Sequence, residues 1–455
     1  METAVAQPAD ARAHEAARLA ARYREVRAAT ALLAAPLSAE DCALQSMPDA
    51  SPVKWHLGHT TWFFETFVLA AAVPSLRPYH PQFRVLFNSY YNAVGPQHPR
   101  PERGLLSRPS LAEVTRYREA VDERVLCWLA GPPPAADLLA VLELGLHHEQ
   151  QHQELILTDV KHLFAANPLR PAYRPAAEAP RDAAPAAGPR LGGDAAERRD
   201  AGGAAGARAG EPTPLRFVGC EGGLREIGHA GPGFAFDNEG PRHRVHLEPF
   251  ALASRLVTQG EYLAFVEDGG YERPDLWLAD GWTWRQGEGV SAPLYWTRGE
   301  AGWSAFTLRG VAPLRPDEPV THVSFYEAAA YAAWAGARLA SEAEWEVAAA
   351  EAPVDGEFVE SGRLHPAPAA PGPGLRQLFG DAWEWTRSDY GPYPGYAPGR
   401  GALGEYNGKF MCNQRVLRGG SCATPRSHVR ATYRNFFPPT ARWQFTGIRL
   451  ARDAD

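Results

Sequence analysis

Two histidines separated by three residues offer the clearest chemistry in this 455-residue sequence. His148 and His152 are the histidines of an HExxH pattern. On a helix, residues four apart share one face, so both imidazoles can bind one metal ion. A second pair, His56 and His59, lies upstream in a segment rich in aromatic residues. We expect one of these upstream histidines to complete a metal site with His148 and His152.

The HExxH pattern is also the zinc-binding motif of one class of metalloproteases, in which the glutamate is the general base. That interpretation requires a third ligand further along the chain. Thr158 stands where the longer protease pattern has a histidine, and the next glutamate after Glu154 is Glu178, in a low-complexity segment. The protease interpretation is therefore disfavoured. Three neutral imidazoles without a carboxylate leave coordination positions open, which suits iron(II) with dioxygen, although zinc is chemically allowed.

The composition argues against several classes of protein. A net charge of -7 does not fit the concentrated basic face that binds nucleic acid. The five cysteines are scattered without a CxxC pair, so neither a disulfide framework nor a zinc ribbon is indicated. The first residues lack the pattern of a signal peptide, and no apolar run reaches the roughly 18 residues of a membrane span. We therefore expect a cytoplasmic enzyme without a nucleic-acid or membrane partner.

The N-terminal part is predicted to be a bundle of helices. Ser51 and Pro52 open the second helix, and Ser110 with Glu113 forms a capping box at the start of the third. A long segment, 74–109, joins these two helices, and connections of this length inside a compact domain are usually functional. A four-helix bundle can hold a metal in its core through inward-facing histidines. The predicted helices span residues 12–35, 51–72, 111–129 and 136–166.

The composition changes near residue 171. Residues 175–213 are almost all Ala, Pro, Gly, Arg, Asp and Glu, which predicts a flexible linker. From residue 214, tryptophan and glycine become frequent and turns are dense. We expect an α+β domain of low regularity there, with one helix at 324–336, a second starting at Ser341, and otherwise short strands and long loops.

Both halves resemble known domains. The histidine motif resembles the DinB-like four-helix domain, and the C-terminal half resembles the formylglycine-generating-enzyme (sulfatase-modifying-factor) domain. The two domains in this order resemble the ergothioneine-biosynthesis sulfoxide synthases, in the branch that uses cysteine. The resemblance implies a helical bundle at 12–170, a linker at 171–213 and an α+β domain at 214–453. The segments that carry it in the C-terminal half include 257–262, 319–328, 336–346, 380–386 and 418–421.

This resemblance implies a non-haem iron(II) enzyme that uses dioxygen as co-substrate. It would join the sulfur of a cysteine-type thiol to the imidazole C2 of hercynine (trimethyl-histidine) and yield a sulfoxide. The implied iron ligands are His59, His148 and His152, with His56 and His147 beside them. A structural calcium ion in the C-terminal domain is left open.

The resemblance also implies residues that bind the substrates. Gln151 and Asn435 would bind hercynine, because amide N–H groups can hold a carboxylate without adding a charge. Phe436 or Trp443 could lie against the trimethylammonium group. Arg100 and Arg103, three residues apart in the long segment, would bind the carboxylate of the thiol. The plain alternative for the two arginines is a solvated pair on a loop.

Tyr90 and Tyr91 resemble the tyrosines of the cysteine-using branch. A phenol near the iron can supply a proton or hydrogen atom and so favour C–S bond formation. The alternative is that these rings only pack in the core. Phe437 stands where relatives that use γ-glutamylcysteine tend to have an acidic residue, which favours free cysteine.

Four other functions stay open or are disfavoured. A selenosugar donor would make the chain a selenoneine synthase of the same architecture. An ovothiol-type synthase often carries a further methyltransferase domain, for which residues up to Asp455 offer no room. A non-catalytic binding protein is disfavoured by the intact histidine set. Formylglycine chemistry needs a cysteine pair near the Gly-Gly-Ser segment, and the spacing of Cys412 and Cys422 does not match it.

Overall fold

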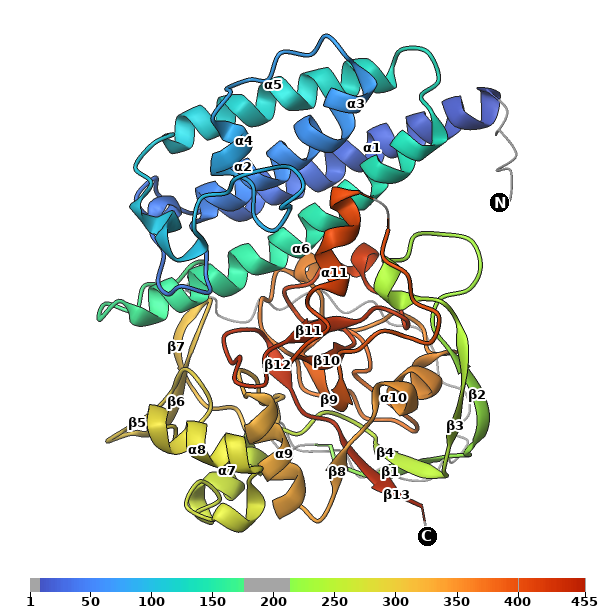
Figure 1. Ribbon diagram of the computed structural model, residues 1–455. Coiled ribbons are helices and arrows are strands. Elements are labelled where there is room, and N and C mark those ends of the chain that lie inside the picture. Colours follow the sequence, from blue (N-terminus) through green and yellow to red (C-terminus); the bar gives the residue numbers. More distant parts are fainter. Residues whose placement is uncertain (1–8, 176–212, 400, 455) are drawn as a thin grey trace, which may run out of the picture.

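A helical part and a sheet-containing part make up the structure (Figure 1). The computed structural model describes residues 9–175, 213–399 and 401–454. The helices of the first part lie together, and α6 (Ala136–Ala166) lies between them and the second part. The predicted α+β class, with the helical region first, is confirmed.

The bundle is built from four long helices, as predicted. α1 (Ala9–Ala34), α5 (Leu111–Leu129) and α6 match the expected helices to within a few residues. α2 (Val53–Phe63) begins within two residues of the expected start and ends before the expected residue 72. The predicted capping box of α5 is present, with Ser110 accepting from the backbone N–H of Glu113. Pro52 is the N-cap residue of α2 and not its first helical residue.

The helix predicted to run to residue 72 does so through an irregular turn. After Phe63 the backbone forms a π-helix, η2 (Phe64–Leu69), and then a short α-helix, α3 (Ala70–Ala72). Such π turns are rare and often lie near functional sites. The long segment that follows contains only two short helices, α4 (Phe83–Leu86) and η3 (Arg100–Leu105). Asn88 braces this segment by donating from Nδ2 to the carbonyl oxygens of Tyr91 and Gly95, each at 3.1 Å.

The second part contains two four-stranded sheets and two smaller ones. The first sheet has the order β1-β4-β13-β8, and the second has the order β11-β10-β9-β12. In the second sheet β10 is antiparallel to β9 and β11, and Leu417 lies opposite Asn435. The strands are β1 (Phe217–Cys220), β2 (Gly223–Ile227), β3 (His243–Leu247), β4 (Phe250–Ala253), β5 (Trp296–Gly299), β6 (Gly302–Thr307), β7 (Gly310–Pro313), β8 (Arg338–Leu339), β9 (Trp383–Asp389), β10 (Arg415–Arg418), β11 (Asn435–Phe437), β12 (Thr446–Gly447) and β13 (Leu450–Asp453).

The helices of the second part are more numerous than expected. α9 (Phe325–Trp334) and α10 (Glu342–Ala349) occupy the two predicted positions. The expectation of only strands and loops elsewhere was wrong, because α7 (Gln259–Glu267) and α8 (Ala279–Glu288) are also helices. In α8 only Gly281 is buried, so this helix lacks the apolar periodicity that sequence patterns detect. The remaining short helices of the second part are α11 (Glu405–Gly408), η4 (Asp237–Glu239), η5 (Pro274–Leu276), η6 (Val359–Ser361), η7 (Ala402–Gly404) and η8 (Arg426–His428). A further short helix, η1 (Asp41–Ala43), lies in the first part.

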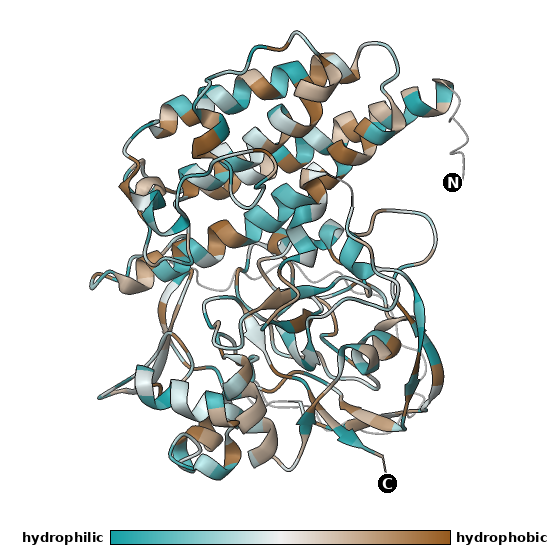
Figure 2. Cartoon of the chain, viewed as in Figure 1, coloured by the Kyte–Doolittle hydropathy of each residue, from teal (hydrophilic) through white to brown (hydrophobic). Residues whose placement is uncertain are grey.

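The two parts share a continuous core, and α6 carries many of the polar contacts between them. The apolar cluster of the bundle extends to Phe306, Cys422 and Phe445 of the second part. Figure 2 shows a hydrophilic stretch in the middle of α6, at the level of the second part. These polar residues are nonetheless buried, and Glu154 accepts hydrogen bonds from Trp383 Nε1 at 2.8 Å and from Ser421 Oγ at 2.6 Å. Buried polar groups need such partners.

The predicted linker falls mainly on residues 176–212, which lie outside the described residues. Its first residues are described and contact the bundle. Tyr173 is buried and donates from its hydroxyl to the carbonyl oxygen of Leu33 at 2.6 Å. Among the described residues, no helix combines the length and the apolar composition needed to cross a membrane.

Candidate active site

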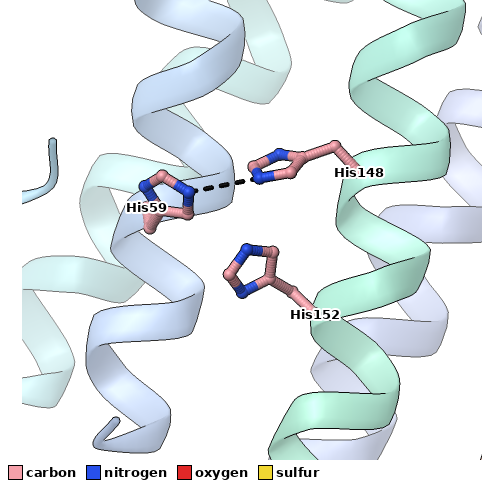
Figure 3. Close-up of side chains that lie close together, drawn as sticks. All are labelled: His59, His148 and His152. Carbon is pink, nitrogen blue, oxygen red and sulfur yellow. Dashed lines mark hydrogen bonds between the residues drawn. The ribbon is translucent and has the colours of Figure 1, made fainter. Parts of the chain in front are cut away.

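Three buried histidines from two helices meet at one point (Figure 3). His59 extends from α2, and His148 and His152 extend from adjacent turns of α6. One nitrogen of each ring lies within 4.8 Å of the others, and His59 Nε2 is 3.2 Å from His148 Nε2. Nitrogens that bind one ion at about 2.1 Å lie roughly 3 Å apart. The expected three-histidine cluster is therefore assembled in the fold.

The protonation of these rings suits metal binding. Burial lowers the pKa of His148 to about 4, and it lowers the pKa of His59 and of His152 well below the usual histidine value. All three rings are thus neutral at pH 7 and carry a lone pair. Two nitrogen lone pairs directed at each other across 3.2 Å repel unless a cation or a proton lies between them. The donor set therefore fits a divalent metal with open positions.

Hydrogen bonds behind the rings orient two of the three histidines. His59 Nδ1 donates to the carbonyl oxygen of Phe87 at 2.6 Å, so its Nε2 is left with a lone pair for a metal. His152 Nδ1 lies 2.8 Å from His56 Nδ1, and His56 Nε2 lies 3.1 Å from Asp159 Oδ2. The carboxylate can only accept, so His56 Nε2 carries the hydrogen and His56 Nδ1 accepts from His152. This row, the Asp159–His56–His152 chain, leaves His152 Nε2 free as a ligand.

Glu149, the glutamate of the HExxH pattern, points away from the histidines. It is fully buried and forms ion pairs of 2.9 Å with Arg27 and with Arg118. Burial alone would raise the pKa of Glu149, but the two guanidinium groups outweigh it and hold the pKa at about 2. A carboxylate held this firmly in its ionised, paired form cannot serve as a general base near the metal. The protease interpretation therefore fails on geometry as well as on sequence.

A cavity of about 210 Å³ opens beside the three histidines, with walls from both parts of the molecule. Its lining includes nearly all of the residues predicted from the sequence. The exception is Tyr91, which packs against Phe67 and Trp62 and faces a neighbouring cavity of about 410 Å³. The predicted residues that line the first cavity are His59, Tyr90, Arg100, Arg103, His148, Gln151, His152, Asn435, Phe436, Phe437 and Trp443.

Arg103 is a buried cation that lacks an anionic partner. Its side chain donates to Ser51 Oγ at 2.9 Å and lies over the Trp55 ring at 3.3 Å, and that ring is stacked on His59. Within residues 9–175, 213–399 and 401–454, no carboxylate lies within ion-pair distance of Arg103. Burial lowers the pKa of Arg103 to about 9, which leaves it charged at neutral pH. A buried, unpaired charge is costly, so this position suits an anionic ligand. Arg100 Nη1 donates to the Tyr90 hydroxyl at 2.7 Å.

Amide and aromatic groups from α6 and β11 also line the cavity and are available to a ligand. Asn435 Oδ1 accepts from the backbone N–H of Phe436 at 2.9 Å, so its NH₂ group is free to donate. Gln151 Nε2 donates to the Tyr433 hydroxyl at 2.9 Å and retains a second N–H. The Phe436 ring is stacked on Tyr390 at 4.0 Å, and the Phe437 ring lies 5.7 Å from Trp443.

Asp159, His428 and Tyr433 belong to the site and were missed in the sequence. Asp159 could have been found, because it follows His152 by seven residues and therefore lies two helical turns along the same face. Tyr433 lies only two residues before Asn435. His428 has no signal in the sequence, because it meets His147, 281 residues away, only in the folded chain.

Two further expectations from the sequence concern the cysteines and a structural calcium ion. Cys422 is buried and burial raises the pKa of its thiol, while Cys412 is exposed, so the two do not form a reactive pair. Among the described residues, His59, His148 and His152 form the one group of three or more histidine, cysteine or acidic side chains placed to hold a metal. The structural calcium ion in the C-terminal domain stays a prediction.

Comparisons with known proteins match both halves of the chain. The profile of the DinB superfamily matches residues 22–156, and that of the sulfatase-modifying factor enzyme 1-like domain matches residues 206–370 and 363–454. The hercynine oxygenase of Mycobacterium tuberculosis is 33% identical over 96% of this chain and 98% of its own. The chain belongs to the hercynine oxygenase family. A second hercynine oxygenase, from Mycolicibacterium thermoresistibile, is 32% identical over 90% of this chain and 89% of its own.

Membership of the hercynine oxygenase family makes the chain an oxidoreductase and confirms the two-domain resemblance found in the sequence. The alternative of a non-catalytic binding protein is thereby set aside. The formylglycine-generating enzyme of Streptomyces coelicolor is 30% identical, but the match covers only 55% of this chain.

Proposed function

We propose that this protein is a non-haem iron(II) sulfoxide synthase of ergothioneine biosynthesis. It would use dioxygen to join the sulfur of cysteine to the imidazole C2 of hercynine. The observation that carries the proposal is the cluster of His59, His148 and His152 on the wall of a cavity between the two parts of the chain. When bound there, iron(II) would supply the activation of dioxygen. Relatives named hercynine oxygenases support the choice of imidazole substrate.

The thiol substrate would bind at the arginine side of the cavity. Arg103 is buried without an anion, and Arg100 lies in the same wall, so a carboxylate there would complete the missing ion pair. This supports a donor with a carboxylate, such as cysteine, over a selenosugar. Phe437 on the wall offers no charge to an additional amino-acid end, which supports cysteine over γ-glutamylcysteine.

Hercynine would bind beside the amide and aromatic groups of α6 and β11. The NH₂ groups of Gln151 and Asn435 can donate to its carboxylate, and the Phe436 ring can lie against the trimethylammonium group. This orientation leaves the imidazole to face the histidines. The two substrates would then be held together in one cavity, as a coupling reaction between them requires.

Tyr90 is the better placed of the two tyrosines to hold the transferable proton. Its hydroxyl lines the cavity and accepts from Arg100, so its own hydrogen is free to point into the cavity. Tyr91 is buried among aromatic rings, and burial raises the pKa of its hydroxyl. We assign a proton-donor role to Tyr90 and a packing role to Tyr91.

The organisation of the chain is part of the proposal. We propose that residues 12–170 form the iron-binding domain, 171–213 the linker and 214–453 the domain that completes the substrate site. We also propose a cytoplasmic location. The five cysteines are all free, including the exposed Cys127 and Cys412, which suits a reducing compartment.

The decisive experiment is oxygen consumption with product mass spectrometry. Iron-loaded protein is incubated with hercynine and with cysteine, γ-glutamylcysteine or a selenosugar, under oxygen. We expect a sulfoxide-linked product from cysteine, and a loss of at least about 100-fold in rate for His148→Ala, because one metal ligand is removed. Oxygen consumption that depends on neither hercynine nor a thiol would overturn the proposal. A product formed preferentially from the selenosugar would assign the alternative synthase.

A further inference from the structure

A second row of hydrogen-bonded side chains runs from α1 to the substrate cavity. Arg22 Nη2 lies 2.7 Å from His147 Nε2, and His147 Nδ1 lies 3.0 Å from His428 Nδ1. His428 Nε2 lies 3.1 Å from the Tyr433 hydroxyl, which lines the cavity. We refer to these four residues as the Arg22–Tyr433 chain. It crosses from the bundle into the second part and ends beside Gln151.

The arginine at its start gives this chain a single direction. A guanidinium group has donors only, so His147 Nε2 must accept and the hydrogen of this ring lies on Nδ1. His147 therefore donates to His428 Nδ1. The hydrogen of His428 then lies on Nε2 and is donated to the oxygen of Tyr433. Each contact in the row thus points toward the cavity.

Tyr433 receives a second hydrogen bond at the same oxygen. Gln151 Nε2 donates to it from 2.9 Å. A phenol oxygen that accepts two hydrogen bonds has used both of its lone pairs. Its own hydrogen must therefore point away from His428 and Gln151. In the part of the chain that the structure describes, this hydrogen has no acceptor. Burial raises the pKa of Tyr433, so the hydroxyl keeps its hydrogen at neutral pH.

We infer that Tyr433 is a substrate-binding residue whose hydroxyl donates a hydrogen bond to the carboxylate of the imidazole amino-acid substrate. Arg22, His147 and His428 are positioning residues that set the direction of this donor. The second N–H of Gln151 and the free NH₂ group of Asn435 line the same cavity. Several uncharged donors in one wall match a carboxylate, which accepts several hydrogen bonds. The identity of the ligand rests on the proposed function, while the direction of the chain does not.

The direction can be measured without a substrate. Nitrogen-15 NMR of histidine-labelled protein reports which ring nitrogen carries the hydrogen. We expect His147 as the Nδ1–H form and His428 as the Nε2–H form. Arg22→Gln introduces a side chain that can also accept, so the row can reverse and the two signals should become mixtures. Arg22→Lys keeps a donor-only group and should retain both forms. Arg18→Gln, one turn earlier on α1, is the matched control because Arg18 also contacts Glu143 but not His147.

Hercynine affinity tests the role of the directed donor. Tyr433→Phe keeps the ring, which lies 5.5 Å from Trp383, and should raise the Kd for hercynine about 10- to 100-fold, the range for a hydrogen bond to a charged group. Arg22→Gln should raise it about three- to tenfold although Arg22 does not line the cavity. In the Tyr433→Phe background Arg22→Gln should have no further effect, because both changes remove the same donor. The decarboxylated analogue of hercynine should bind wild type and Tyr433→Phe equally.

The outcomes separate the inference from the proposed function. Reversed or mixed tautomers in the wild type would overturn the direction of the chain. Wild-type affinity in Tyr433→Phe, or additive effects in the double variant, would overturn the role of Tyr433. If the wild type shows the expected tautomers but does not bind hercynine, the proposed substrate is wrong, and with it the assigned ligand. The direction of the hydrogen bonds that ends at the Tyr433 hydroxyl would still hold.

Discussion

Two rows of hydrogen-bonded imidazoles meet at α6 and run in opposite senses. The end of the Asp159–His56–His152 chain that lies away from the metal position is an anion, and the end of the Arg22–Tyr433 chain that lies away from the cavity is a cation. In the first row every N–H points toward the carboxylate, so a lone pair remains at the metal position. In the second row every N–H points toward the cavity, so a hydrogen remains for the substrate. The charge at the far end of each row therefore decides whether the near end is a metal ligand or a hydrogen-bond donor.

Both rows include residues of α6, which ion pairs connect to the other helices of the bundle. Breaking these ion pairs should cause the largest loss of stability. Glu149 on α6 pairs with Arg27 of α1 and Arg118 of α5. Glu149→Gln leaves two buried guanidinium groups without a full negative charge and should lower the free energy of unfolding by about 3–5 kcal/mol at pH 7. Urea unfolding of metal-free protein measures this loss.

The pH dependence of unfolding follows from the same ion pairs. The pKa of Glu149 is about 2 in the folded protein, below that of an unfolded glutamate. Its contribution is therefore complete above about pH 4.3 and is lost as the pH falls toward 2. The difference between wild type and Glu149→Gln should shrink over that interval. Glu15→Gln is the control, because its partner Arg18 is exposed and such surface pairs contribute less than about 1 kcal/mol.

Changes in the Asp159–His56–His152 chain should alter metal affinity rather than substrate affinity. His56→Leu removes the acceptor behind His152, and Asp159→Asn removes the charge that orients His56. Each should weaken binding of cobalt(II), a spectroscopic substitute for iron(II), by about 10- to 100-fold. His56→Gln retains an acceptor and should recover part of the loss.

A buried carboxylate elsewhere in the bundle controls for general damage. Glu65 accepts from the Tyr117 hydroxyl at 2.7 Å and lies outside both rows. Glu65→Gln should lower stability and leave cobalt(II) affinity within about twofold of wild type. Equal cobalt(II) affinity in wild type, His56→Leu and Asp159→Asn would show that the Asp159–His56–His152 chain does not orient a metal ligand.

The smallest effect is expected at a hydrogen bond that lies beside the second row without belonging to it. Gln150 Nε2 donates to Ser427 Oγ at 2.7 Å, next to His428 in the sequence. Ser427→Ala should lower the free energy of unfolding by about 1 kcal/mol. Hercynine affinity should not change, since no contact of the Arg22–Tyr433 chain is lost. A change in affinity as large as that of Arg22→Gln would mean that any break in this interface disturbs the cavity.

The bundle was predictable because its signals are local. Pro52 and the Ser110–Glu113 box mark where α2 and α5 begin, since capping depends on residues close in the sequence. α8 was not predicted, because only Gly281 in it is buried and no apolar face marks it as a helix. Tyr90 and Tyr91 are adjacent, yet only Tyr90 reaches the cavity of the histidines. Which of the two does so depends on the turns of the segment braced by Asn88, and no periodic pattern encodes these turns.

The spacing of four residues already places His148 and His152 on one helical face, because this periodicity is a property of every α-helix. The motif around His59 pointed to the third ligand through its resemblance to a known family. Which ring nitrogens carry hydrogens depends on the tertiary structure, because Arg22, His428 and Asp159 reach their partners through the packing of α1, α2 and the C-terminal part against α6. Direction in a hydrogen-bonded row depends on what lies at its far end, and that end is distant in the sequence.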